Sequence, residues 1–187
     1  EEFRAGLAEV IKYGVIYDAT LFDYLEQNTE KIMRLEKECL MHIIKTSCSI
    51  KAKVVEKDER ESHYRMILNY GHTLGHAIEA LTGYSKFIHG EAVAIGMVYA
   101  AKLSHQLGKC PQEIPERIME LVKKCGLPVD LPDLDPQMII ESLYHDKKTI
   151  NKAHVDVINL NKIEESYIRP MCFYGSEGMG LRADNLK

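Results

Sequence analysis

The sequence predicts a mainly α-helical domain with at most one or two short strands. Apolar residues recur at intervals of three and four along most of the chain, which is the spacing of an amphipathic helix. The run "AHVDVINL", Ala153–Leu160, is the one clear strand-like segment, because it alternates and is rich in β-branched residues. A parallel α/β sheet would need such runs to repeat, so a helical fold is favoured.

Start and stop signals agree with the apolar periodicity. Gly83, Gly108 and Gly126 stand where helix patterns end, and Asp135 before Pro136 is a typical helix start. The expected helices span about Phe3–Glu26, Glu30–Asp58, Met66–Leu81, Glu91–Leu107, Gln112–Cys125 and Pro136–Asp146.

Composition excludes several classes of function. With 24 basic and 28 acidic residues, the net charge of -4 gives no general attraction to nucleic acid or to an anionic membrane. The longest uncharged run, Ala92–Ala101, is about half the ~20 residues that a membrane span needs. The 5 cysteines show no C-x-x-C spacing and are expected to be reduced thiols of a cytoplasmic protein. The chain opens at Glu1 in helical pattern, as if cut from a longer polypeptide.

Charged residues interrupt two apolar helix faces. In "AGLAEVIKYGVIY", Glu9 and Lys12 are three apart on a helix that is otherwise apolar nearly all round. They form either an ion pair at the edge of the core or part of a polar site, because isolated buried charges are costly. Lys51 continues a stripe with Ile44, Cys48 and Val55, so it either extends to solvent or points an ammonium into an anion-binding cleft.

Three histidines gather in "LNYGHTLGHAIEALTGYSKFIHGEAVAIGM". His72 and His76 are four apart on one helix face, and His89 follows a turn from which it can return to that face. Together with Glu9, two or three of them suit a catalytic zinc site with one open position. The spacing alone does not separate three histidine ligands from two ligands and a base. A metalloprotease is disfavoured, because Thr73 stands where H-E-x-x-H has its glutamate.

Two further polar groups adjoin this stretch. Glu61, Arg65 and Asn69 lead to His72 at spacings of four, four and three, and form one ridge if the helix is continuous. Taken singly, Glu61 and Arg65 also suit a solvated face. The run "HDKK", residues 145–148, is either a second anion contact or a charged helix end, and the residues alone favour the helix end.

The motifs "AEVIKYG", "KAKVVEKDERE", "LNYGHTLGHAIE" and "HGEAVAIGM", in this order, resemble the 3-dehydroquinate synthase family, and "HDKK" fits the same pattern. The resemblance covers about residues 1–160 and implies only the C-terminal, mostly helical domain of a two-domain enzyme. The N-terminal NAD-binding domain of the family is absent from residues 1–187. His63 stands where relatives often have glycine, the segment after "HDKK" lacks an expected glycine, and residues 170–187 form a poorly defined tail.

The resemblance implies a role for each polar residue singled out above. The resemblance implies that His72 is a metal ligand and that His76 is a proton carrier that faces the substrate. The implied metal ligands, for Zn²⁺ or alternatively Co²⁺, are Glu9, His72 and His89. The implied catalytic residues are His76, Lys12 and Glu61. The implied substrate contacts are Lys51, Arg65, Asn69 and one of Lys147 and Lys148.

The implied reaction is the NAD- and metal-dependent conversion of 3-deoxy-D-arabino-heptulosonate 7-phosphate to 3-dehydroquinate and phosphate, a step of the shikimate pathway to chorismate and aromatic amino acids. The partners expected are this small sugar phosphate and a second copy in a full-length homodimer, with neither nucleic acid nor membrane. The chain is expected to be inactive without its N-terminal half. Alternatives are 2-deoxy-scyllo-inosose synthase or another sugar-phosphate cyclase, a metal-dependent alcohol or polyol dehydrogenase, and a non-catalytic zinc-binding fragment.

Overall fold

The computed structural model describes residues 1–58 and 64–150, and every regular element in these two ranges is a helix. The mainly α-helical prediction is therefore confirmed, while the strand-like run 153–160 and the tail 170–187 lie outside the described residues. The elements are α1 (Glu2–Ile16), α2 (Ala19–Met33), α3 (Lys37–Lys57), the short 3-10 helix η1 (Tyr64–Asn69), α4 (His72–Leu81), α5 (His89–Gln106), α6 (Glu113–Lys124) and α7 (Pro136–Ile150).

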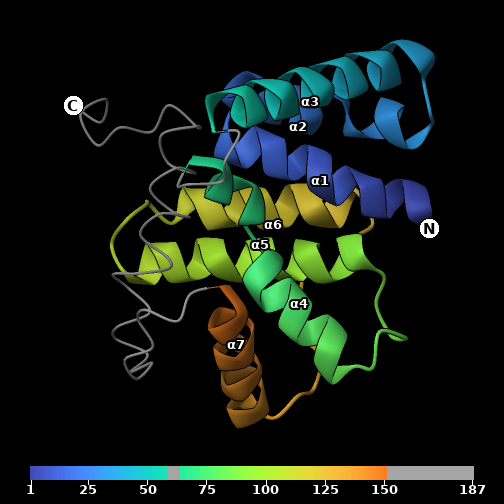
Figure 1. Cartoon of the computed structure of the whole chain (residues 1–187). Helices are drawn as coiled ribbons and strands as arrows, with labels where there is room; N and C mark the ends of the chain where they lie inside the picture. Colours follow the sequence, from blue (N-terminus) through green and yellow to red (C-terminus); the bar gives the residue numbers. More distant parts are fainter. Residues whose placement is uncertain (59–63, 151–187) are drawn as a thin grey trace.

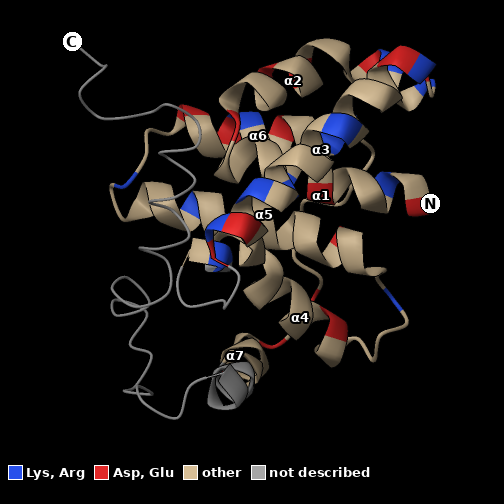
Figure 2. Ribbon diagram, turned by 45° about the horizontal axis from the view of Figure 1, so that its top comes forward, with Lys and Arg blue, Asp and Glu red and all other residues tan. Residues whose placement is uncertain are grey.

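Helix α5 is the centre of the packing. Its sequence "AVAIGMVYAA" is apolar on all faces, and every residue from Ala92 to Val98 is buried. A helix of this kind must be covered on all sides, and α5 contacts α1, α4 and α6. Figure 1 shows α1, α6 and α5 across the middle of the molecule, with α2 and α3 on one side and α4 and α7 on the other. Acidic and basic residues are intermixed in the view of Figure 2.

The predicted helix Phe3–Glu26 is wrong as one element, because the chain breaks at Tyr17 and Asp18. The Asp18 side chain accepts hydrogen bonds from the backbone N–H groups of Thr20 and Leu21, at 3.0 and 3.2 Å, and starts a new helix. An aspartate in this position satisfies donors that the first turn leaves unpaired. Glu9 is thus carried by α1 alone, which packs against α5.

The predicted helix Met66–Leu81 is also wrong in its first half. Residues 64–69 form the 3-10 helix η1, and the chain then turns at Gly71, whose φ of +79° belongs to the left-handed region. A Cβ at Gly71 would lie 2.6 Å from Cγ of Met97, so the turn is pressed against α5. Because the helix is not continuous, the proposed single ridge through Arg65, Asn69 and His72 does not exist.

The remaining end signals are confirmed. Gly83, Gly108 and Gly126 follow the ends of α4, α5 and α6 with φ values of 65°, 67° and 70°, as glycine at such positions does. Asp135 precedes α7 and accepts a hydrogen bond from the Gln137 N–H at 2.9 Å. Among the described helices, none combines the length and the apolar character that crossing a membrane requires.

Candidate metal centre

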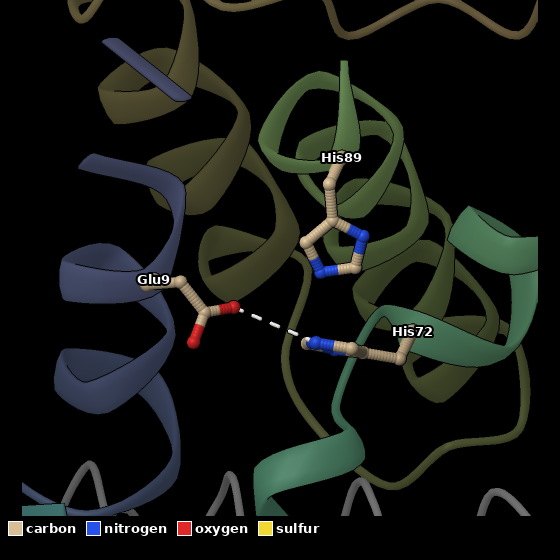
Figure 3. A group of neighbouring side chains, drawn as sticks. All are labelled: Glu9, His72 and His89. Carbon is tan, nitrogen blue, oxygen red and sulfur yellow. Dashed lines mark ion pairs between the residues drawn. The ribbon is translucent and has the colours of Figure 1, made fainter. Parts of the chain in front are cut away.

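Three helices each bring one potential metal ligand to the same place. Glu9 comes from the middle of α1, His72 is the first residue of α4, and His89 is the first residue of α5. One ligand atom from each side chain can be chosen so that all three lie within 4.8 Å of one another. Figure 3 shows the three side chains pointing toward one another, with Oε1 of Glu9 at 3.5 Å from Nε2 of His72. A carboxylate and two imidazoles at this spacing suit a divalent metal with an open coordination position.

The two histidine rings are held by partners that can only accept hydrogen bonds. Nδ1 of His72 lies 3.2 Å from the carbonyl oxygen of Tyr70, and Nδ1 of His89 lies 3.2 and 3.3 Å from the carboxylate oxygens of Glu79. Each Nδ1 must therefore carry the hydrogen, which leaves the lone pair of Nε2 free to bind a metal ion. Such outer partners of metal-binding histidines orient the ring and fix its tautomer.

The surroundings of His72 favour the neutral form of its ring. Burial, followed by the positive charge of Lys12, lowers the pKa of His72 from 6.5 to about 4, although the Tyr70 carbonyl and Glu9 act in the opposite direction. The ring is consequently uncharged at neutral pH, which is the form that binds a metal ion.

Lys12 is almost completely buried, with an exposed fraction of 3 %. Its Nζ lies 3.0 and 2.8 Å from the two carboxylate oxygens of Glu9, so the ion pair considered from the sequence is present. The same carboxylate also approaches His72. The Glu9–Lys12 ion pair is therefore itself part of the polar site, and the two alternatives considered from the sequence are both correct. Burial lowers the pKa of Lys12, Glu9 opposes this, and the charge of Lys51 adds to the lowering.

His76 lies one turn after His72 on α4 and is exposed. Its ring centroid is 5.6 Å from that of His72 and 5.9 Å from that of His89. His76, Glu79 and His89 form a second group whose ligand atoms fall within 4.8 Å of one another. The geometry thus offers two candidate triads that share His89, of which the triad with Glu9 and His72 is the more buried.

The stripe predicted for Lys51 is not the buried face of α3. Ile44 is 59 % exposed, and Cys48 and Lys51 are also exposed. The residues of α3 that face the core lie one position away, at Cys39, Ile43, Ile50 and Val54. The charge of Lys51 nevertheless contributes to the lowering of the pKa of Lys12, so the two ammonium groups repel one another.

The other predicted substrate residues lie in two segments, η1 and α7. Arg65 is half-buried in η1 and its backbone N–H donates to Oδ2 of Asp58 at 3.0 Å, while Asn69 is exposed at the end of η1. Lys147 and Lys148 belong to α7, which packs against the histidine-bearing α4, but their side chains lie outside the described residues. Glu61 also lies outside the described residues.

Sequence reasoning missed Glu79 as a member of the site. It lies on the buried face of α4, and its side chain is 12 % exposed. The signal was present, because Glu79 follows His72 by seven positions and His76 by three, which are spacings of one helix face. An acidic residue on that face needs a partner, and His89 from α5 is the partner that the structure places there.

The fold and the site together define a helical domain with three potential metal ligands gathered at one place. Residues 6–149 match the family described as 3-dehydroquinate synthase C-terminal, and the chain belongs to this family. The resemblance read from the motifs is therefore confirmed. A 3-dehydroquinate synthase from Thermoanaerobacter pseudethanolicus is 55% identical over 167 residues, which are 89% of this chain and 47% of that protein. The chain spans about half the length of the curated relatives it matches.

Solved structures of sugar-phosphate cyclases share the fold. A 2-epi-5-epi-valiolone synthase from Streptomyces hygroscopicus subsp. jinggangensis, with NAD⁺ and Zn²⁺ bound, superimposes with a TM-score of 0.75 at 21% identity, over 94% of this chain and 51% of that one. A 2-deoxy-scyllo-inosose synthase complexed with carbaglucose-6-phosphate, NAD⁺ and Co²⁺ gives a TM-score of 0.61 at 30% identity, over 76% of this chain and 39% of that one.

Proposed function

We propose that this chain is the metal- and substrate-binding half of a 3-dehydroquinate synthase, which converts 3-deoxy-D-arabino-heptulosonate 7-phosphate to 3-dehydroquinate and phosphate. The observation that carries the proposal is the meeting of Glu9, His72 and His89 beside the buried Lys12. Relatives that are 49–56% identical bear the name of this enzyme. This identity is higher than the 30% to 2-deoxy-scyllo-inosose synthase, so we prefer the dehydroquinate reaction.

Glu9, His72 and His89 are the proposed ligands of a zinc or cobalt ion. The donor set fits such an ion, because one carboxylate and two neutral imidazoles leave coordination positions for substrate. The bound metal would supply Lewis acidity that lowers the pKa of a substrate hydroxyl and polarises the corresponding ketone. Solved cyclases of this fold contain Zn²⁺ or Co²⁺, which supports the choice of metal.

Positive charge beside these ligands suits an anionic substrate. Lys12 and Lys51 repel one another, since the charge of Lys51 lowers the pKa of Lys12, and a bound carboxylate or phosphate would offset that repulsion. We assign Lys51, Arg65, Asn69 and one of Lys147 and Lys148 to the substrate's charged and hydroxyl groups. Arg65 has the planar fork that binds such anions through two parallel hydrogen bonds.

His76 is the proposed proton carrier. It is exposed, lies one turn from His72 and is not required by the Glu9 triad. Histidine is the side chain that enzymes use most often to transfer protons to and from a substrate. Lys12 and Glu61 are the other proposed catalytic groups, with Lys12 orienting a substrate oxygen from its buried position.

The cofactor and partners of the whole enzyme belong to the same proposal. NAD⁺ would supply the hydride chemistry from a nucleotide-binding domain in the half of the relatives' length that this chain does not match. We further propose a cytoplasmic homodimer. The cytoplasmic location is supported by the free thiols of Cys39, Cys48, Cys110 and Cys125 in the described part of the chain.

Phosphate release tests the proposed reaction. The assay uses these residues joined to their nucleotide-binding half, with NAD⁺ and Zn²⁺, and compares the heptulosonate phosphate with glucose 6-phosphate and sedoheptulose 7-phosphate. We expect release from the first substrate with no net change in NAD⁺. Release only from glucose 6-phosphate would identify an inosose synthase. Net reduction of NAD⁺ by a simple alcohol would identify a dehydrogenase.

A matched pair of histidine variants tests the division of roles within the site. His76→Asn is expected to retain the metal and to lose turnover, whereas His72→Asn is expected to lose the metal. Equal metal loss in both variants would make His76 a ligand and reject its role as proton carrier. Metal content is measured on the purified proteins after gel filtration.

A further inference from the structure

We infer that Glu79 is a positioning residue of the metal centre, which holds the His89 ring so that its Nε2 faces Glu9 and His72. This inference rests on the proposed metal site and adds a residue to it. The contact joins α4 to α5, because both carboxylate oxygens of Glu79 lie within 3.3 Å of Nδ1 of His89.

The Glu79 carboxylate is well fixed, whereas the His89 ring needs support. The Glu79 side chain is 12 % exposed and the His89 side chain is 49 % exposed. Around Glu79, α4 packs tightly on α5, since a Cβ added at Gly75 would lie 3.2 Å from the backbone of Val93. The backbone carbonyl of Glu79 also accepts the N–H of Tyr84 at 2.8 Å, which closes the turn after α4. Glu79 is therefore a rigid anchor for a more exposed ring.

The burial of the Glu79 carboxylate on this face of α4 is unfavourable, and apolar packing does not compensate it. Removing an ionised carboxylate from water is unfavourable unless a charged or hydrogen-bonding partner compensates it. His89 supplies an N–H donor to it, and a metal ion at Nε2 would make that N–H more acidic and the hydrogen bond stronger. The hydrogen bond with a metal-bound His89, rather than packing in the core, would therefore compensate the burial of the Glu79 carboxylate.

The two ligand histidines are held in different ways. His72 donates to the neutral carbonyl of Tyr70, whereas His89 donates to a charged carboxylate. The backbone at His89 is fixed separately, because the Ile88 N–H donates to Oε2 of Glu91 at 3.2 Å in the first turn of α5. Loss of Glu79 should therefore release the ring of His89 while its backbone and the ring of His72 stay in place.

The second candidate triad gives a competing interpretation. Glu79 also lies near His76 and His89 in a group that could itself hold a metal ion. In that arrangement Glu79 is a ligand, and His76 is as necessary as Glu79. As a positioning residue, Glu79 acts through His89 and its effect is independent of His76.

The test uses the full 187-residue chain and five variants, which are Glu79→Ala, Glu79→Gln, His76→Asn, Glu9→Gln and His72→Asn. Two properties are measured at a pH where free imidazole is neutral: the ring tautomers of the metal-free protein, from long-range ¹H–¹⁵N spectra of histidine, and the Zn²⁺ affinity, by competition with a chromophoric chelator. The His72 ring serves as the internal control, because its partner is the backbone of Tyr70.

We expect the His89 hydrogen to lie on Nδ1 in the unaltered chain and to distribute over both nitrogens in Glu79→Ala, with His72 unchanged. The Zn²⁺ affinity should fall about 10–100-fold in Glu79→Ala, as for other outer partners of metal ligands. It should fall less in Glu79→Gln, whose amide oxygen still accepts the hydrogen bond. Unchanged His89 tautomers or an affinity within about twofold of the original would overturn the inference.

Two further results keep the inference separate from the proposed function. If His76→Asn weakens Zn²⁺ as much as Glu79→Ala does, Glu79 is a ligand in the second triad and the positioning role is rejected. If Glu9→Gln and His72→Asn both retain full Zn²⁺ affinity, the proposed metal centre itself is wrong. If these two variants lose the metal and Glu79→Ala does not, the centre stands and only the role of Glu79 is rejected.

Discussion

The substitution Gly90→Ala should loosen the metal centre without touching a ligand. Gly90 follows His89 in the first turn of α5, and a Cβ there would lie 2.2 Å from the carbonyl oxygen of Ala5 in α1. The two helices would have to separate by about 0.8 Å for this contact to reach 3.0 Å, below which real Cβ atoms are essentially never found. Glu9 is one helical turn from Ala5 and would move with α1.

The displacement is large on the scale of metal coordination. Metal–ligand distances are held to about 0.2 Å, so a shift four times as large prevents Glu9 from binding a metal together with His89 unless the site rearranges. We expect the Zn²⁺ affinity to fall at least tenfold. The overpacked contact should also cost about 1–3 kcal/mol of the free energy of unfolding, which exceeds the roughly 1 kcal/mol that alanine gains over glycine in a helix.

Gly6→Ala is the matched control. Gly6 lies in α1, and a Cβ added there meets nothing within 4 Å. The same chemical change should therefore raise stability by up to about 1 kcal/mol and leave Zn²⁺ affinity unaltered. Chelator competition measures the affinity, and urea unfolding of the metal-free chains measures stability. If Gly90→Ala bound Zn²⁺ as tightly as Gly6→Ala, the α1–α5 spacing would not control the site and the reasoning would be refuted.

The other predictions concern pH, charge and capping. Between pH 6.5 and about 4 the unfolded chain binds a proton at His72 that the folded chain does not. The free energy of unfolding of the metal-free chain should therefore decrease as the pH is lowered through this window, by at most about 3 kcal/mol. Urea unfolding of the unaltered chain and of His72→Gln at pH 7 and 4.5 measures this, and equal slopes would contradict it. Lys12→Met should leave stability equal or higher, since a desolvated ammonium is removed, yet abolish phosphate release by the complete enzyme. Retained turnover would reject its catalytic role. Asp18→Ala should cost about 1 kcal/mol through loss of the α2 cap, with Asp18→Asn, which can still cap, as the control. An equal loss in both variants would show that the cap's hydrogen bonds are not responsible.

Local chemistry made much of this fold readable from the sequence. Apolar periodicity located most of the helices. The helix ends predicted at Gly83 and Gly126 were correct, because a glycine in the left-handed conformation ends a helix through local backbone geometry. The motifs around His72 and His89 identified the family and named the candidate ligands. The break at Asp18 was also legible, as an N-cap, but the continuous apolar pattern through it obscured the signal.

Properties that depend on neighbouring helices could not be read in this way. Which of two adjacent stripes of α3 is buried, that of Ile44 or that of Ile43, depends on where the other helices lie. The chain turns at Gly71 against α5, which leaves no room for a side chain there. This contact with another helix could not be predicted from the apolar pattern of the surrounding residues.

The sequence by itself determined the helical class, the family and the identity of the residues proposed as ligands. Only the tertiary structure decided that Glu9, His72 and His89 meet, that Lys12 is buried against Glu9, and that Glu79 holds His89. The physical reason is that these groups lie on α1, α4 and α5, up to 80 positions apart, counting from Glu9 to His89. Their approach is set by the packing of helices on α5, where small residues such as Gly75 and Gly90 permit close contact.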